Sequence, residues 1–183
     1  MRSSGSASKP ERDRHTCFGR AIRAPSTTIP PVIIYVDADA CPARDEIIFI
    51  AKRHTLTPIF IANKSIPAIA SNRDARMQVV EGAFDAADDW IVEQAKPGDL
   101  VMTADLLLAQ RVVKNGVEAM NFSGGQFTDD SIHELVARRE IQKMLRESNL
   151  PSHQPVPYGK QNRSNLKSSL HTWIETRKRK ATG

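Results

Sequence analysis

From Val32 onward, apolar runs of strand length alternate with amphipathic stretches of helix length. Five of these runs predict β-strands, at residues 32–36, 58–62, 77–80, 99–103 and 117–120. The first reads Val-Ile-Ile-Tyr-Val without a polar residue, which is typical of a strand buried on both faces. Because the strands alternate with helices, the pattern predicts an α/β fold with right-handed crossovers and a mainly parallel, five-stranded sheet.

The helical stretches are placed by their apolar spacing and by their first and last residues. The predicted helices span 42–54, 85–96, 106–114, 128–148 and 164–179, and residues 64–76 read as an irregular segment. In the fourth helix the apolar positions change phase: Ile132 and Leu135 share one face, whereas Ile141 and Leu145 lie on another. We therefore expect this helix either to break near Arg139 or to be buried on two sides.

Composition and charge divide the chain into three parts. Residues 1–31 are rich in Ser, Pro and Arg without an apolar period, and they predict a disordered extension. Residues 32–150 predict one α/β domain, and residues 151–183 a proline-rich linker and a basic helix belonging to the same unit. The net charge of +5 conceals an acidic centre, with 18 Asp/Glu against 13 Lys/Arg in 32–150, between two basic ends. Basic ends attract polyanions such as RNA, although solvated tails have the same composition.

The broad class follows from what the sequence lacks. No apolar run approaches the roughly 18 residues that a membrane-spanning helix needs, so no membrane association is expected. Two cysteines, Cys17 and Cys41, give neither a disulfide framework nor a zinc-type cluster, which favours a reducing cytoplasm. The sequence leaves a homo-oligomer open.

Carboxylates at the predicted strand ends are the most informative chemical feature. Asp37 and Asp39 follow the first strand, Asp105 follows the fourth, and Asp88 lies in the first turn of a helix. In parallel sheets, ligands bind outside the carboxyl ends of the strands, so these groups should gather at one edge. Crowded carboxylates repel one another, and a hard cation such as Mg²⁺ or Mn²⁺ relieves the repulsion through oxygen ligands. The pattern therefore predicts a divalent-metal site made of Asp37, Asp39, Asp88 and Asp105.

Each of these residues also has a purely structural interpretation. Asp85 and Asp88 resemble a helix-capping pair, and we expect Asp85 to be the cap. Asp105 could favour a helix dipole, and Asp39 could be a turn residue. Two polar residues, Asn63 and Thr103, end adjacent strands of the predicted sheet and are candidates for binding substrate oxygens, but they are also ordinary caps.

Three segments carry a family resemblance. They are Val36-Asp37-Ala38-Asp39-Ala40-Cys41-Pro42, Phe84 to Ile91 (FDAADDWI) and Gly98 to Asp105 (GDLVMTAD). In this order and spacing they resemble the signatures of the YaiI/YqxD family, and the resemblance covers about 32–180. It implies a three-layer fold similar to that of PIN and NYN ribonuclease domains, which gather Asp residues around Mg²⁺ or Mn²⁺ at the carboxyl end of a parallel sheet. Carried over by motif, that analogy points to the same four residues, Asp37, Asp39, Asp88 and Asp105.

The chain departs from the family pattern at two places. The turn after the fifth strand reads Phe-Ser-Gly-Gly-Gln over 122–126, where the family usually has a Pro-Arg-Gly-Glu type turn. Residues 105–109 read Asp-Leu-Leu-Leu-Ala, where the family usually has Asp-Ile-Pro-Leu-Ala. If the turn contacts substrate, its altered charge affects specificity or activity.

Three functions fit these features. The first is a metal-dependent nuclease, acting on RNA rather than DNA. The second is a phosphohydrolase of the haloacid-dehalogenase type, with Asp37 as nucleophile, Asp39 as acid/base and Thr103 in a supporting role; the sequence offers no convincing later lysine for it. The third is a non-catalytic nucleic-acid binder that relies on its basic ends.

Overall fold

The computed structural model describes residues 32–39, 41–82, 85–148 and 157–182. The predicted disordered extension 1–31 and the first six residues of the predicted linker, 151–156, lie outside this range. The described elements, in chain order, are β1 (Ile34–Asp37), α1 (Arg44–Arg53), β2 (Ile59–Ala62), α2 (Pro67–Ala70), β3 (Arg76–Val79), α3 (Ala86–Gln94), β4 (Leu100–Met102), α4 (Leu106–Lys114), β5 (Glu118–Met120), β6 (Gln126–Phe127), α5 (Asp129–Glu147) and α6 (Lys160–Thr182).

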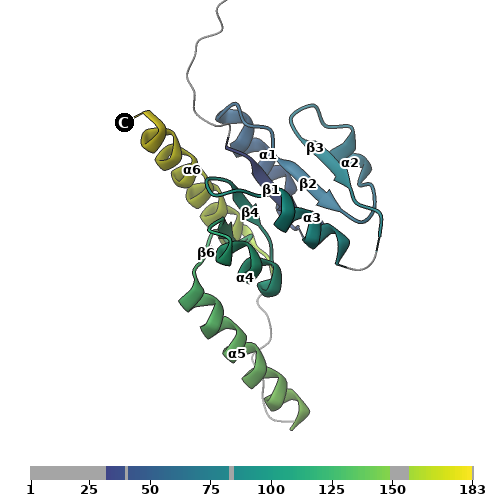
Figure 1. The fold of residues 1–183 in the computed structure, drawn as a ribbon, viewed down its shortest axis with the longest axis vertical. Coiled ribbons are helices and arrows are strands. Elements are labelled where there is room, and N and C mark those ends of the chain that lie inside the picture. Colours follow the sequence, from purple (N-terminus) through teal and green to yellow (C-terminus); the bar gives the residue numbers. More distant parts are fainter. Residues whose placement is uncertain (1–31, 40, 83–84, 149–156, 183) are drawn as a thin grey trace, which may run out of the picture.

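The strands form one sheet in the order β3-β2-β1-β4-β5-β6 (Figure 1). The first five strands are parallel, which confirms the predicted α/β class. The sixth strand was not predicted: Gln126 and Phe127 return antiparallel to β5, so residues 123–125 form the turn of a β-hairpin. A strand of two residues is too short to show a period of two.

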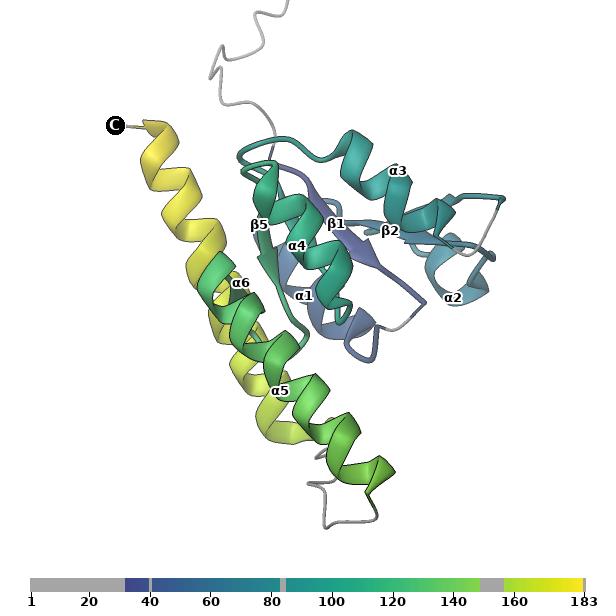
Figure 2. The ribbon, with the colours of Figure 1, turned by 60° about the horizontal axis from the view of Figure 1, so that its bottom comes forward.

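Helices cover both faces of the sheet and create two hydrophobic cores. Alternate residues of β1 divide between them, with Ile34 and Val36 in one core and Tyr35 in the other. The first core lies under α1, α2 and α6, and the second under α3, α4 and the first turns of α5. The result is the predicted three-layer arrangement, which Figure 2 shows with α6 running beside β5.

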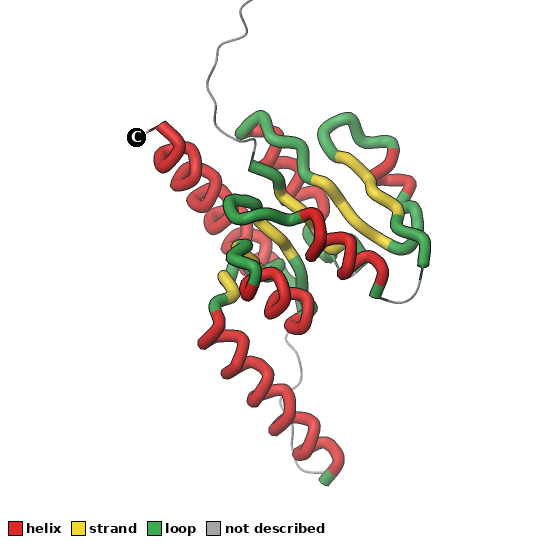
Figure 3. The backbone as a smooth tube through the Cα atoms, viewed as in Figure 1, coloured by secondary structure: helices red, strands yellow, loops and turns green. Residues whose placement is uncertain are grey.

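Two local predictions about helices were wrong. The segment 64–76 contains a short helix, α2, which Pro67 begins at a position where its missing N–H costs no hydrogen bond. Helix α5 neither breaks near Arg139 nor is buried on two sides. It continues from Asp129 to Glu147 and extends away from the sheet (Figure 3), so Ile141 and Met144 are 56% and 64% exposed.

Helix α6 begins at Lys160, four residues before its predicted start, and supplies four side chains to the first core. Leu166, Leu170, Trp173 and Ile174 are all buried there, at spacings that place them on one helical face. None of the described helices combines the length and apolar character needed to cross a membrane.

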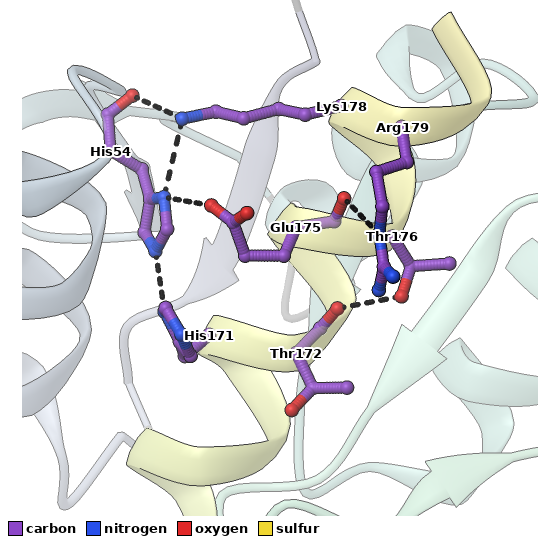
Figure 4. A network of polar contacts seen from close by, with 7 residues as sticks. All are labelled: His54, His171, Thr172, Glu175, Thr176, Lys178 and Arg179. Atoms are coloured by element: carbon purple, nitrogen blue, oxygen red, sulfur yellow. Dashed lines mark hydrogen bonds and ion pairs between the residues drawn. The ribbon is translucent and has the colours of Figure 1, made fainter. Parts of the chain in front are cut away.

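A polar network joins α6 to the end of α1 (Figure 4). The buried His54 ring contacts His171 through Nε2 at 2.8 Å, and its Nδ1 lies 3.2 Å from both Glu175 Oε1 and Lys178 Nζ. Burial lowers the pKa of His54, as do Lys178, His171 and Arg53, whereas Glu175 opposes the shift. The folded protein therefore favours the neutral imidazole.

This network predicts a loss of stability in mild acid. Because the folded pKa of His54 lies below its unfolded value of about 6.5, the unfolded chain binds more protons as the pH falls through that range. The stability that the neutral His54 contributes is fully present above pH 6.5, and it is lost as the pH falls towards the folded pKa. We expect the melting temperature to fall between pH 7.5 and pH 5.5, and His54→Gln to reduce that slope. The exposed His133→Gln is the control; equal slopes in both variants would contradict the assignment.

Candidate functional site

The carboxyl ends of β1 and β4 lie side by side at the centre of the sheet. The chain leaves β1 towards β2 and β3, but it returns to β4 and β5 on the other side, so the strand order reverses between β1 and β4, the place where such sheets bind ligands. Asp37 ends β1, and Thr103 follows β4 directly. The register pairs Val36 with Met102, which brings Asp37 and Thr103 together.

Thr103 links two of the predicted site residues. Its fully buried hydroxyl donates a hydrogen bond to Asp37 Oδ2 at 2.9 Å and accepts one from the backbone N–H of Asp105, also at 2.9 Å. Burial raises the pKa of Asp37, the Thr103 hydrogen bond lowers it, and the charges of Asp39 and Asp105 raise it further. The Asp37 carboxylate is therefore held in a fixed position in surroundings that disfavour its charge.

Asp105 is both a helix cap and a member of the cluster. Its Oδ1 accepts hydrogen bonds from the backbone N–H groups of Leu107 at 2.6 Å and Leu108 at 3.3 Å, at the start of α4. The structural interpretation of Asp105 as a residue favoured at a helix N-terminus therefore holds. Both of these bonds use Oδ1, so the cap does not occupy Oδ2. Capping fixes the side chain beside Asp37 and Asp88, whose charges interact with it.

Asp88, the third residue of α3, is the most perturbed carboxyl group of this edge. Burial, followed by the charges of Asp37, Asp105 and Asp85, raises its pKa to about 6. Asp85 is the N-cap residue, as expected, but its side chain makes no capping hydrogen bond. The next residue, Asp89, points to solvent and forms a 2.6 Å ion pair with Arg111. One helical turn thus carries one carboxylate towards the strand ends and one away from them.

Asp39 occupies a different part of the edge. Its Oδ2 accepts a hydrogen bond from the backbone N–H of Asn63, at 3.3 Å, beyond the end of β2. Asp39 is exposed, and its charge raises the pKa of Asp37. The prediction that Asn63 and Thr103 end adjacent strands was wrong, because β1 lies between β2 and β4. The charges of Asp37, Asp88 and Asp105 interact with one another, and Asp39 lies beside this group.

The fit of this group to a cation can be judged from its donors. Among the residues that the structure describes, no three His, Cys, Asp or Glu side chains converge closely enough to form a ready metal site. Mg²⁺ commonly keeps several waters and uses only one or two protein carboxylates together with substrate phosphates. Oxygen donors that repel one another suit such a hydrated hard cation, which needs only one or two of Asp37, Asp88 and Asp105 as direct ligands.

The sequence reasoning did not identify Arg44, which begins α1 close to this edge. Its Nη2 donates to the carbonyl oxygen of Ala38 at 3.1 Å, and its buried Nε has no partner among the described residues. No local sequence pattern indicates this role, because the fold alone brings Arg44 to the Ala38 carbonyl. Cys41, nearby, is a free and buried thiol, and burial raises its pKa to about 12, which disfavours the nucleophilic thiolate.

Charge crowding predicts that Asp88→Asn stabilises the metal-free protein at neutral pH. The folded pKa of Asp88, about 6, exceeds the ordinary value of 3.8. The protonated Asp88 therefore contributes stability at low pH, and this stability is lost as the pH rises through 6. Since the side chain is partly exposed, solvent screening reduces the gain to about 1 kcal/mol, or roughly 2–4 °C in melting temperature at pH 7.5. Thermal melts at pH 4 and pH 7.5 test this. Asp89→Asn, which loses an ion pair, should give no gain, and a gain at pH 4 would contradict the explanation.

Comparison with known proteins gives a consistent result. Residues 35–176 match the family model described as the uncharacterised YaiI/YqxD family. A UPF0178 protein of Rhodospirillum rubrum is 36% identical over 146 residues, which cover 80% of this chain and 97% of the relative. A UPF0178 protein of Parvibaculum lavamentivorans is 37% identical over 80% of this chain and 96% of its own length. A UPF0178 protein of Rhodopseudomonas palustris strain BisB5 is 41% identical over 79% of this chain and 87% of its own length. No solved structure matches.

Proposed function

This chain belongs to the YaiI/YqxD family, and we propose that it is a divalent-metal-dependent phosphodiesterase that cleaves RNA. The observation that carries the proposal is the gathering of Asp37, Asp88 and Asp105 at the carboxyl ends of β1 and β4, where the strand order reverses and the carboxylates raise one another's pKa. Because one fold supports many functions, these side chains support the proposal and the fold alone does not.

Each residue has a defined part in this proposal. Asp37, Asp88 and Asp105 would hold Mg²⁺ or Mn²⁺, with Asp39 at the side of the site. When bound, the cation would supply an activated water and offset the charge that develops on the phosphoryl group. Thr103 orients Asp37 through its hydroxyl, and Asn63 follows β2 at the same edge of the sheet, where its side chain could contact substrate oxygens.

The two basic ends of the chain favour a polyanionic substrate over a small phosphate ester. A phosphohydrolase that uses Asp37 as nucleophile is the competing chemistry. It requires an aspartyl-phosphate at Asp37, and trapping that intermediate with a small phosphate ester would favour it over hydrolysis by an activated water.

The decisive experiment is metal-dependent cleavage of end-labelled single-stranded RNA. We expect products with Mn²⁺ or Mg²⁺ and none with a chelator, and a single-stranded DNA of the same sequence should be cleaved more slowly. Asp88→Asn should lose activity, whereas Asp89→Asn on the same helical turn should keep it. Cleavage that persists in the chelator, or that both variants retain, would overturn the proposal.

A further inference from the structure

A groove of about 530 Å³ runs between α6 and the β5–β6 hairpin, beside the sheet rather than at its centre. Figure 2 shows α6 lying along β5, where the groove forms. Its walls contain hydroxyl groups, an amide and two basic side chains; the lining residues are Glu118, Gly124, Gln126, Ser168, Ser169, Thr172, Trp173, Thr176, Arg177 and Lys180.

One wall of the groove is a single stripe of α6. Ser168, Thr172, Thr176 and Lys180 follow one another at intervals of four residues, so they lie on one helical face. This stripe extends along about 18 Å of helix. The Thr176 hydroxyl donates to the Thr172 carbonyl at 2.8 Å, whereas the Ser168 and Thr172 side chains are exposed to the groove. The wall therefore presents hydrogen-bonding groups along its length and a positive charge at one end.

The negative charge of the groove is already balanced. Glu118, at the start of β5, accepts hydrogen bonds from Trp173 Nε1 and from Arg177, and the Arg177 guanidinium lies 5.5 Å from the centre of the Trp173 ring. Lys180 makes no ion pair with any residue that the structure describes. Of the charged residues that line the groove, Arg177 and Lys180 are positive and Glu118 is negative, so the lining carries a net charge of +1, which favours an anion.

The other end of the groove reaches the edge of the sheet that carries the carboxylates. Gly124 lies in the turn that follows the carboxyl end of β5, and its backbone packs closely against α6. A Cβ atom at this position would lie 2.7 Å from Ser169 Oγ and 2.9 Å from the Asn165 carbonyl oxygen, and the φ of +87° also favours glycine. A chain bound along α6 would therefore lead towards the edge where Asp37 and Asp105 lie.

We propose that this groove binds the phosphodiester backbone of single-stranded RNA and guides it to the carboxylate edge; this inference rests on the proposed function. Hydroxyl, amide and basic side chains are the groups with which proteins contact phosphate and sugar. Trp173 is only 5% exposed, so no aromatic face is offered for stacking a base. The groove therefore reads backbone and 2′-hydroxyl groups rather than sequence.

The role of the groove is tested by measuring RNA binding under conditions that do not allow cleavage. The measurement is the anisotropy of a labelled single-stranded RNA of mixed sequence, titrated with the full chain in a metal chelator at several salt concentrations. Lys180→Glu should weaken binding at least tenfold and reduce the dependence of affinity on salt. Lys167→Glu makes the same charge change on the same helix, but Lys167 lies over the Phe49 ring of α1, outside the groove, so about a twofold loss is expected. Equal losses in the two variants, or equal affinity for DNA of the same sequence, would overturn the proposal.

The same variants separate the groove from the proposed reaction. Lys180→Glu should raise the KM for RNA cleavage and leave kcat near the wild-type value, whereas Asp37→Asn should bind RNA normally in the chelator. If Asp37→Asn loses cleavage but Lys180→Glu and Lys167→Glu bind equally, the groove is wrong and the reaction stands. If only Lys180→Glu loses binding and no metal-dependent cleavage occurs, the reaction is wrong and the groove stands as a binding site.

Discussion

Asp37→Asn is expected to reduce metal-dependent RNA cleavage by about 10³-fold. The substitution removes the charged ligand at the centre of the carboxylate group, and the loss corresponds to roughly 4 kcal/mol of transition-state stabilisation, the scale of metal-ion catalysis. The amide oxygen of Asn can still accept the hydrogen bond that Thr103 donates to Asp37 Oδ2. Because burial raises the pKa of Asp37, removing its charge should also leave the melting temperature unchanged or slightly higher. Single-turnover rates with Mn²⁺, measured beside thermal melts, test both parts.

Thr103→Val provides a graded comparison with Asp37→Asn. It keeps the shape of the buried side chain but removes the hydrogen bonds to Asp37 and to the Asp105 backbone. Partners that orient a metal ligand typically contribute 10–100-fold, so an intermediate loss is expected. Asp89→Asn, exposed on the far side of α3, should retain full activity. Wild-type rates in Asp37→Asn, or a Thr103→Val defect larger than that of Asp37→Asn, would contradict the assigned roles.

The long elements of the fold could be predicted because their sequence patterns are local and strong. The apolar run that becomes β1 is buried on both faces, as its composition predicts, and Pro42 precedes α1 by two residues. Helix α4 ends at Lys114, followed by Asn115 and Gly116, as its terminal residues indicate. In each case the hydrophobic pattern and the residues at the ends favour the same structure.

The missed features depend on contacts between distant parts of the chain. The antiparallel pairing of Gln126 with Met120 creates β6 from a segment with no strand pattern of its own. The distal half of α5 keeps apolar residues, including Ile141 and Met144, on a helix that extends away from the sheet. An apolar position in a sequence predicts burial, but it does not state which surface covers it.

The candidate site could be predicted in outline but not in detail. Strand ends placed Asp37 and Thr103 at one edge, because parallel strands fix which ends meet. The sequence could not separate Asp39, bonded to the Asn63 backbone beyond β2, from Asp88, which α3 brings towards Asp37. That distinction depends on the strand order and on where α3 crosses the sheet. Neither is encoded within one motif.

Leu170→Ala is expected to lower the free energy of unfolding by about 3 kcal/mol. Leu170 is fully buried where α6 packs on the first core, and a Leu→Ala change at such a position leaves a cavity that costs roughly 2–5 kcal/mol. Leu107→Ala removes the same atoms from a side chain that is 68% exposed, and it should cost less than about 0.5 kcal/mol. Urea unfolding, followed by two probes to test for a single transition, measures both.

A single transition with a large loss for Leu170→Ala alone means that α6 and the sheet unfold together, so that the groove along α6 exists only while the carboxylate edge is folded. A small loss for Leu170→Ala would instead mean that α6 is a dispensable appendage to the sheet.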